Sequence, residues 1–179
     1  MFNYSTGQVI DEPITLKMEN YEINFALESV TVNMGGSLSV ISQLIYNSSN
    51  LMSNNKIQHI EKRHLEGSPN VSKKGKRTVF LDSFISDAND LKKQITKTLR
   101  DDEFMDELND AVINTFNEIT KNGDERLIQL TYTSATPIGY DLRDSKKKDL
   151  YQITLDFGVT RKSPDTAIVS LKSMYPKRK

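Results

Sequence analysis

The sequence predicts a single α+β domain, in which N-terminal strands and helices are followed by a C-terminal four-stranded antiparallel sheet. Apolar residues recur mainly at helical spacing between about residues 37 and 122, whereas they alternate at every second position after Gly123. Helices that precede a block of strands are typical of α+β domains. A chain of 179 residues is long enough to bury one core. Within it we distinguish an N-terminal lead-in, residues 1–54, from an α+β region, residues 55–179.

The lead-in is predicted to hold strands and one helix. Residues 1–12 show no periodicity, and apolar residues then alternate from Pro13 to Met34, which is strand periodicity. The glycines after Met34 indicate a turn, and Ser37 suits a helix N-cap. Apolar residues at helical spacing predict a helix from about Ser37 to Leu51.

Three further helices and a short strand are predicted before Gly123. The first helix spans Asn55–Leu65, and Ser68–Gly75 reads as a loop. Arg77–Leu81 has a strand-like composition. The next helix starts at Asp82 or Ser83, and its apolar face comprises Phe84, Ala88, Leu91, Ile95 and Leu99. The last helix carries Phe104, Leu108, Val112 and Ile119 and ends by Asn122-Gly123.

Four strands are predicted after Gly123. They are Arg126–Thr133, Ile138–Leu142, Leu150–Thr160 and Thr166–Tyr175. Turn-forming residues separate them, and the connections are short. Short connections between successive strands predict an antiparallel meander.

Composition narrows the classes of function. The chain has no cysteine, which excludes disulfides, thiolate catalysis and cysteine-ligated zinc, and its two histidines lack an adjacent carboxylate pattern for a metal. We therefore expect no cofactor and no metal. No apolar run approaches the roughly 18 residues of a membrane span, and the N-terminus does not have the pattern of a signal peptide. We expect a monomer that acts in the cytoplasm without contacting a membrane.

The charge is zero in sum but segregated along the chain. Residues 56–77 carry seven basic and two acidic residues, a net charge of +5, and residues 161–179 carry six basic and one acidic, again +5. Residues 81–126 carry six basic and twelve acidic residues, a net charge of −6. We expect the two basic stretches to meet in the fold and to bind phosphate.

Both histidines lie on the predicted helix Asn55–Leu65. At about 100° per residue, His59 and His64 are separated by roughly 140° around the helix axis. A pair of histidines acting on one bond is therefore disfavoured, and one of them is expected to be structural. His59 shares its face of this helix with Arg63. Which histidine is catalytic stays open at this point.

The residue types suit RNA cleavage without a metal. Such a reaction needs a base for the 2′-hydroxyl, an acid for the 5′-oxygen, and cations or hydrogen-bond donors for the phosphoryl oxygens. The 2′-hydroxyl belongs to the substrate, so such an enzyme cleaves RNA and spares DNA. Histidine serves as acid or base near neutral pH, and Lys and Arg pair with phosphate.

Three motifs in order resemble a known family. His59-Ile60-x-x-Arg63-His64, then Arg77-Thr78-Val79-Phe80, then Ser173-Met174-Tyr175-Pro176 resemble the motifs of ribonuclease toxin domains of the barnase/EndoU/colicin-like (BECR) fold. The similarity is to the RNase A-like domains at the C-termini of contact-dependent growth-inhibition and other polymorphic toxins. It runs from Ile57 to the end of the chain. Ser173 stands where the family usually has threonine.

The resemblance implies a metal-independent endoribonuclease and a set of site residues. The implied catalytic residues are His64, Arg77, Thr78, Ser173 and Tyr175. RNA is expected to contact His59, Arg63, Lys73, Lys74 and Lys76. The substrate would be RNA, with tRNA among the RNAs to be considered, and the product a 2′,3′-cyclic phosphate. The resemblance also implies a cognate immunity protein and delivery as part of a larger toxin.

Each of these residues also has a structural interpretation. A histidine in a helix is often a hydrogen-bonded core residue, and a basic run is often a solvated surface. Lys172 is expected to face away from Ser173 and Tyr175, because neighbouring strand residues point to opposite faces. The alternative function is a non-catalytic nucleic-acid- or protein-binding module, of phage or plasmid origin, that uses the same basic face.

Overall fold

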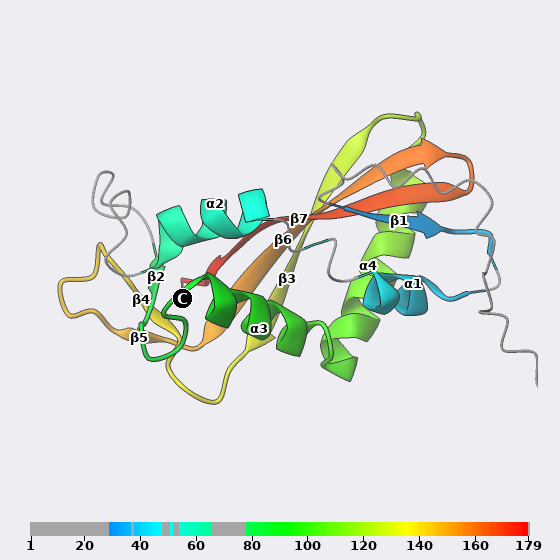
Figure 1. Cartoon of the computed structure of the whole chain (residues 1–179). Coiled ribbons are helices and arrows are strands. Elements are labelled where there is room, and N and C mark those ends of the chain that lie inside the picture. Colours follow the sequence, from blue (N-terminus) through cyan, green and yellow to red (C-terminus); the bar gives the residue numbers. More distant parts are fainter. Residues whose placement is uncertain (1–28, 37, 48–50, 52–53, 66–77, 179) are drawn as a thin grey trace, which may run out of the picture.

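The computed structural model describes residues 29–36, 38–47, 51, 54–65 and 78–178. In this part of the chain a four-stranded antiparallel sheet forms the centre of the molecule (Figure 1). Its strands are β1 (Val30–Asn33), β3 (Glu125–Thr133), β6 (Gln152–Ser163) and β7 (Thr166–Pro176). They are arranged in the order β1-β7-β6-β3, and every neighbouring pair is antiparallel.

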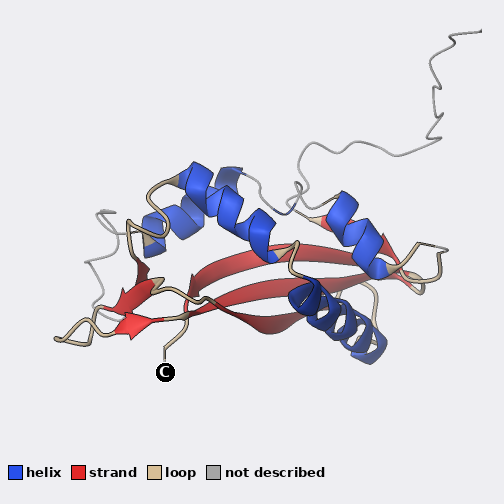
Figure 2. Cartoon of the chain, turned by 90° about the horizontal axis from the view of Figure 1, so that it is seen from below, coloured by secondary structure: helices blue, strands red, loops and turns tan. Residues whose placement is uncertain are grey.

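The helices gather along one side of these strands (Figure 2). They are α1 (Val40–Tyr46), α2 (Asn54–His64), α3 (Ala88–Thr98) and α4 (Asp102–Glu118). Each helix buries apolar residues that recur at helical spacing, as in Leu91 and Ile95 of α3, which packs against α2. The predicted single α+β domain is therefore confirmed.

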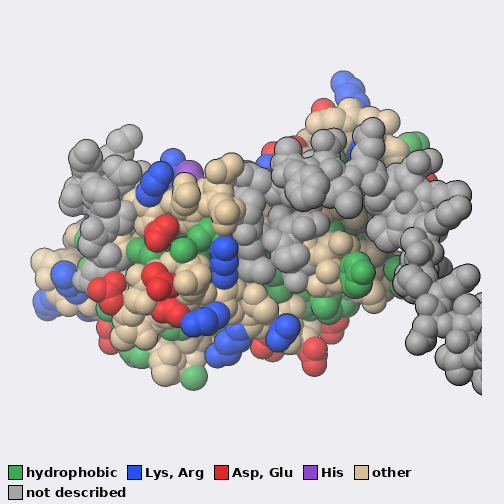
Figure 3. Space-filling model, viewed as in Figure 1, with side chains coloured by type: hydrophobic (Ala, Val, Ile, Leu, Met, Phe, Trp, Pro, Cys, Tyr) green, Lys and Arg blue, Asp and Glu red, His purple; other side chains and the backbone are tan. Residues whose placement is uncertain are grey.

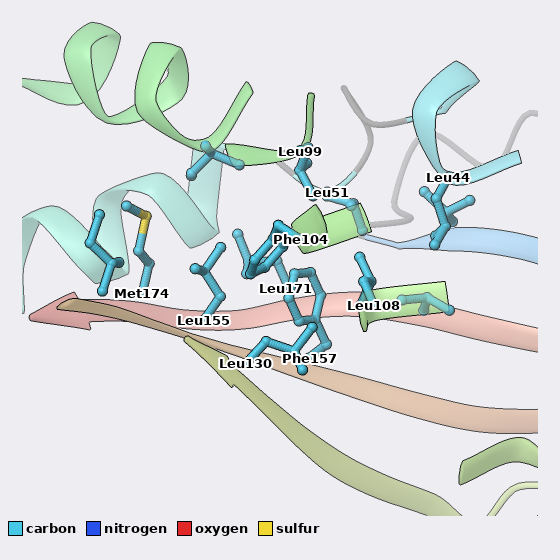
Figure 4. Close-up of a cluster of buried hydrophobic side chains, with 14 of the residues drawn as sticks. Leu44, Leu51, Leu99, Phe104, Leu108, Leu130, Leu155, Phe157, Leu171 and Met174 are labelled. Carbon is cyan, nitrogen blue, oxygen red and sulfur yellow. The ribbon is translucent and has the colours of Figure 1, made fainter. Parts of the chain in front are cut away.

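One continuous core lies between the helices and the sheet (Figure 4). Leu155 and Phe157 on β6 point toward Phe104 and Leu108 of α4 and toward Leu171 of β7. All five are at most 3% exposed. The residues of β6 between them, such as Asp156, point to the opposite face of the sheet, as the two-residue period of a strand requires.

The four-stranded sheet is not the predicted meander of four successive C-terminal strands. Its fourth strand is β1, from the N-terminal lead-in, while the predicted strand Ile138–Leu142 forms β4 (Gly139–Asp141) of a separate sheet. That sheet has the order β2 (Thr78–Phe80), β4, β5 (Asp149–Leu150). The physical reason is that β3 pairs with β6 from Glu125 to Thr133, so this edge of β6 is already occupied.

Two predicted helix starts were wrong. Ser39, rather than Ser37, caps α1, because the Ser39 hydroxyl accepts a hydrogen bond from the Ser42 amide. Asp87, rather than Asp82 or Ser83, caps α3, where its carboxylate accepts from the amides of Asn89 and Asp90. Strand alternation predicted up to Met34 is confirmed over Val30–Asn33, and residues 13–28 lie outside the described residues.

Candidate active site

A cleft of about 610 Å³ lies where the C-terminal ends of α2 and β7 meet. It gathers residues from five elements and the chain end, namely His59, Arg63 and His64 of α2, Thr78 of β2, Gln129 of β3, Thr154 and Asp156 of β6, Lys172, Ser173, Tyr175 and Pro176 of β7, and Lys177 and Arg178. In Figure 3 a histidine lies at the surface beside Lys and Arg side chains, over the position of α2. Six of the predicted site residues therefore share one cleft.

His64 is the last residue of α2, and its position is fixed by β2. The residue is 9% exposed, and its Nδ1 atom lies 2.9 Å from the carbonyl oxygen of Thr78. A carbonyl oxygen can only accept a hydrogen bond, so Nδ1 carries the proton and donates it. In the neutral ring, Nε2 is then the nitrogen with the lone pair. This is the tautomer in which Nε2 can act as a base.

Tyr175 on β7 forms the neighbouring wall. Its ring stacks on the His64 imidazole, with centroids 5.6 Å apart and planes inclined by 25°. The Gln129 side-chain amide donates to the Tyr175 hydroxyl at 2.9 Å and to Asp156 Oδ1 at 2.8 Å. Partial burial, followed by the charge of Asp156 and a hydrogen bond to it, raises the pKa of Tyr175 above its ordinary value. The phenol therefore stays protonated at neutral pH and can donate.

Lys172 lies in the cleft, contrary to the prediction from strand alternation. A β-bulge shifts the register between β6 and β7, so that Ser173 pairs with Asp156 while Leu171 pairs with Phe157. The extra residue is Lys172, and its side chain is thereby turned toward the cleft. Its ammonium forms an ion pair with Glu125 across the surface of Gly158.

His59 and Arg63 line the same cleft as His64, from the adjacent side of α2. His59 is half-buried and Arg63 exposed. The angular separation that we expected to exclude one histidine therefore does not put the two histidines in different sites. Both histidines thus remain within the candidate site.

The end of the chain supplies two more cations. Lys177 donates to the Thr131 hydroxyl at 3.0 Å, and Arg178 lies 2.8 Å from the Asp141 carboxylate. Asp141 also accepts from Arg143, and this hydrogen bond is the main reason why the pKa of Asp141 is lowered. The pairing attaches the end of the chain to the small sheet.

The two basic stretches do approach each other in the described part of the chain. Arg63 from the first and Lys172, Lys177 and Arg178 from the second line one cleft, where Asp156 is the one carboxylate among the lining residues. Thr78 and Ser173 line it as well, and the Thr78 carbonyl accepts the hydrogen bond from His64. The predicted residues Lys73, Lys74, Lys76 and Arg77 lie outside the described residues.

Sequence reasoning missed Gln129 and Asp156. Both lie on the face of the sheet opposite the core and face each other in the β3–β6 register. Their signal was present in the alternation of each strand, since polar residues flanked by buried ones mark the solvent face. Their proximity depended on the strand pairing, which one sequence does not reveal.

Among the described residues, no group of three or more His, Asp or Glu side chains is placed to hold a metal ion. None of the helices in the described ranges is both long enough and apolar enough to cross a membrane. Comparison of the chain with protein-family models, curated proteins and solved structures found no match.

Proposed function

We propose that this protein is a metal-independent endoribonuclease, with the reaction centred on His64 and Tyr175. The observation that carries the proposal is the fixed tautomer of His64, stacked on a protonated phenol in a cationic cleft. The cleft offers what cleavage through the 2′-hydroxyl requires: a base, a proton donor and cations for the phosphate.

In the proposed reaction His64 Nε2 takes the proton of the 2′-hydroxyl. The 2′-oxygen attacks the phosphorus, and the bond from phosphorus to the 5′-oxygen breaks. The Tyr175 phenol gives its proton to that oxygen, which leaves as a hydroxyl. The products are a 2′,3′-cyclic phosphate and a free 5′-hydroxyl. The His64 imidazolium then releases its proton to solvent, and the Tyr175 phenolate recovers one from solvent.

The remaining side chains are assigned to the phosphate and to positioning. Lys172 and Arg63 neutralise the negative charge on the phosphoryl oxygens, which is the usual role of Lys and Arg beside a phosphate. Gln129 donates to the Tyr175 hydroxyl and so orients the phenol. Burial and, after it, Asp156 raise the pKa of the phenol, and Asp156 Oδ1 accepts a hydrogen bond from the Tyr175 hydroxyl at 3.4 Å. Arg77 and Ser173 retain the phosphate-binding and positioning roles that the family resemblance implies.

The proposal includes a biological setting, which follows from the resemblance to polymorphic-toxin ribonucleases. The chain would act on RNA in the cytoplasm of a target cell, and the producing cell would hold an inhibitor protein. An inhibitor that covers this cleft would meet Arg63, Lys172, Lys177 and Arg178, so its contact surface would be acidic. Toxicity on expression, relieved by an acidic protein encoded next to this one, would support this setting.

The experiment that tests the proposed chemistry compares two substrates of identical sequence. One is a short RNA, and the other carries a single 2′-deoxynucleotide at the site of cleavage, both with EDTA present. We expect cleavage of the first and none of the second at that site, with a cyclic phosphate on the upstream product. Cleavage of both substrates would exclude attack by the 2′-hydroxyl.

The alternative is a binding module that holds nucleic acid at this cleft without cutting it. The same four cations favour it. Under this alternative the RNA stays intact, and its affinity falls steeply with salt because binding to phosphates releases counterions. Replacing His64 would then leave binding almost unchanged, whereas under the first proposal it slows cleavage by about 10²- to 10⁴-fold.

A further inference from the structure

The outer face of α3 forms a second cationic hollow, of about 650 Å³. It is lined by Lys92, Lys93, Thr96, Lys97, Arg100, Asp101 and Tyr132. Figure 3 shows Lys and Arg side chains along the position of α3. None of these residues lines the cleft of His64.

The periodicity of α3 collects these cations on one side. At about 100° per residue, positions 92, 93, 96 and 97 fall within an arc of roughly 140°, and Arg100 follows in the turn after α3 ends at Thr98. The buried residues Leu91, Ile95 and Leu99 fall on the other side. The net charge of −6 over residues 81–126 gave no sign of this cationic face, because most of the acidic residues of that range lie outside α3.

These cationic side chains form few hydrogen bonds or ion pairs with the rest of the described protein. Lys92 donates to the Asn54 side chain at 3.3 Å, and Lys93 pairs with Asp90 at 3.1 Å while its side chain is 78% exposed. Lys97 and Arg100 are exposed, and neither has a carboxylate partner among the described residues. The Asp101 carboxylate accepts a hydrogen bond from the Phe104 amide and so caps the N-terminus of α4.

We propose that this face of α3 binds the phosphate backbone of single-stranded RNA, outside the site of cleavage. The helix rises about 1.5 Å per residue, so Lys92 to Lys97 span roughly 7.5 Å, and Arg100 extends the row in the turn after α3. Three successive phosphates of a stacked strand span roughly 7 Å, at 3.4 Å per step. The row of cations thus matches a row of phosphates, and Tyr132 offers a partly exposed ring beside it.

The composition of the hollow favours nucleic acid over a protein partner. Protein interfaces are enriched in aromatic residues, methionine and arginine, and they are depleted in lysine. Here three lysines and one arginine provide most of the lining. The assignment of the strand as RNA rests on the proposed function, whereas the binding of a phosphate backbone does not.

The test uses the full chain and an unreactive ligand, a fluorescent single-stranded DNA oligonucleotide, because DNA lacks the 2′-hydroxyl. Binding is followed by fluorescence anisotropy over a series of salt concentrations. The variant is K97E/R100E, and the matched control is K121E/K162E, which makes the same change in total charge at exposed lysines elsewhere. Circular dichroism and thermal unfolding establish that both variants fold.

We expect K97E/R100E to weaken binding at least tenfold near physiological salt. The slope of log affinity against log salt should fall by about 0.7 for each phosphate that the variant no longer neutralises. The control should change both quantities much less. Equal changes in the two variants would overturn the proposal, as would unchanged DNA binding accompanied by weaker binding to an acidic protein.

Cleavage assays separate this inference from the proposed function. With a dinucleotide, the shortest RNA that contains a cleavable bond, K97E/R100E should cleave as the wild type does. With a long RNA its KM should rise. If no RNA is cleaved but K97E/R100E still loses more DNA binding than K121E/K162E does, the ribonuclease proposal is wrong. The proposal that α3 binds a phosphate backbone is then still supported.

Discussion

The imidazole of His64 stacks on the phenol ring of Tyr175, with 5.6 Å between the ring centroids. One residue ends α2 and the other lies near the end of β7, so the contact joins the helical layer to the sheet. The stack holds the proposed base and the proposed proton donor side by side in the cleft. The proposed reaction therefore depends on this pair and on the residues that hold it in place.

Tyr175→Phe removes the proposed acid and keeps the stacked ring. We expect RNA cleavage to slow by 10²- to 10⁴-fold, the usual contribution of acid catalysis. A substrate with a nitrophenol in place of the 5′-nucleoside needs no protonation of its leaving group. The variant should therefore cleave this substrate almost as fast as the wild type does, while His64→Ala should not. Equal loss on both substrates would contradict the acid role of Tyr175.

Lys172 is predicted to contribute to the transition state through its charge. Lys172→Met keeps much of the side-chain volume and should lower kcat on the order of a hundredfold. Glu125→Gln is the matched control, because it breaks the same ion pair but retains the ammonium. We expect this control to retain activity. A loss in Glu125→Gln as large as that in Lys172→Met would show that the ion pair, rather than the cation, matters.

Two glycines near the cleft should differ in their tolerance of alanine. A Cβ on Gly139 would lie 2.3 Å from the Val79 carbonyl oxygen and 2.7 Å from Pro176 Cγ. We expect Gly139→Ala to destabilise the protein by about 1–3 kcal/mol, as overpacking does. On Gly158 the nearest atoms belong to Lys172 and Glu125, whose flexible side chains can move. Urea unfolding should therefore show a smaller loss for Gly158→Ala, and the opposite ranking would contradict the packing described.

Asp141 should make stability depend on pH in the acid range. Its pKa is lowered in the folded protein, mainly by the hydrogen bond from Arg143, so the ionised form stabilises the fold above the unfolded-state pKa of about 3.9. This contribution is lost as the pH falls through the lowered value. Asp141→Asn should cost up to about 1 kcal/mol at neutral pH, since the site is partly solvated.

Thermal unfolding at several pH values measures this dependence. The difference between the wild type and Asp141→Asn should begin to narrow near pH 4 and close below it. Asp149→Asn, at an exposed position in the same sheet, is the control and should show little difference at any pH. A constant difference for Asp141→Asn across this range would mean that its effect is not electrostatic.

Much of the fold followed from local patterns. Helical spacing located α2, α3 and α4, and strand alternation located β3, β6 and β7, because each pattern reflects one face buried against a core. The pairing of the strands was harder to predict from the sequence. Val30 and Val32 indicated a strand, but nothing local showed that it pairs with β7, since pairing depends on which edges stay open in the whole sheet.

The same limit applies to the candidate site. His64 and Tyr175 were singled out from motifs, and the structure brings them into contact. Lys172 was misplaced because a bulge reverses the alternation at that position, and a bulge is a property of two paired strands. Asp156 and Gln129 became visible only through the register that sets them opposite each other.

The most direct test of the central claim is the incubation of total RNA with the purified wild-type protein and with His64→Ala, in EDTA. We expect the wild type to cleave RNA and leave 2′,3′-cyclic phosphate ends. The variant should fold and be slower by 10²- to 10⁴-fold, because it lacks the base. Undiminished cleavage by folded His64→Ala, or no cleavage by the wild type under any condition, would contradict the assignment.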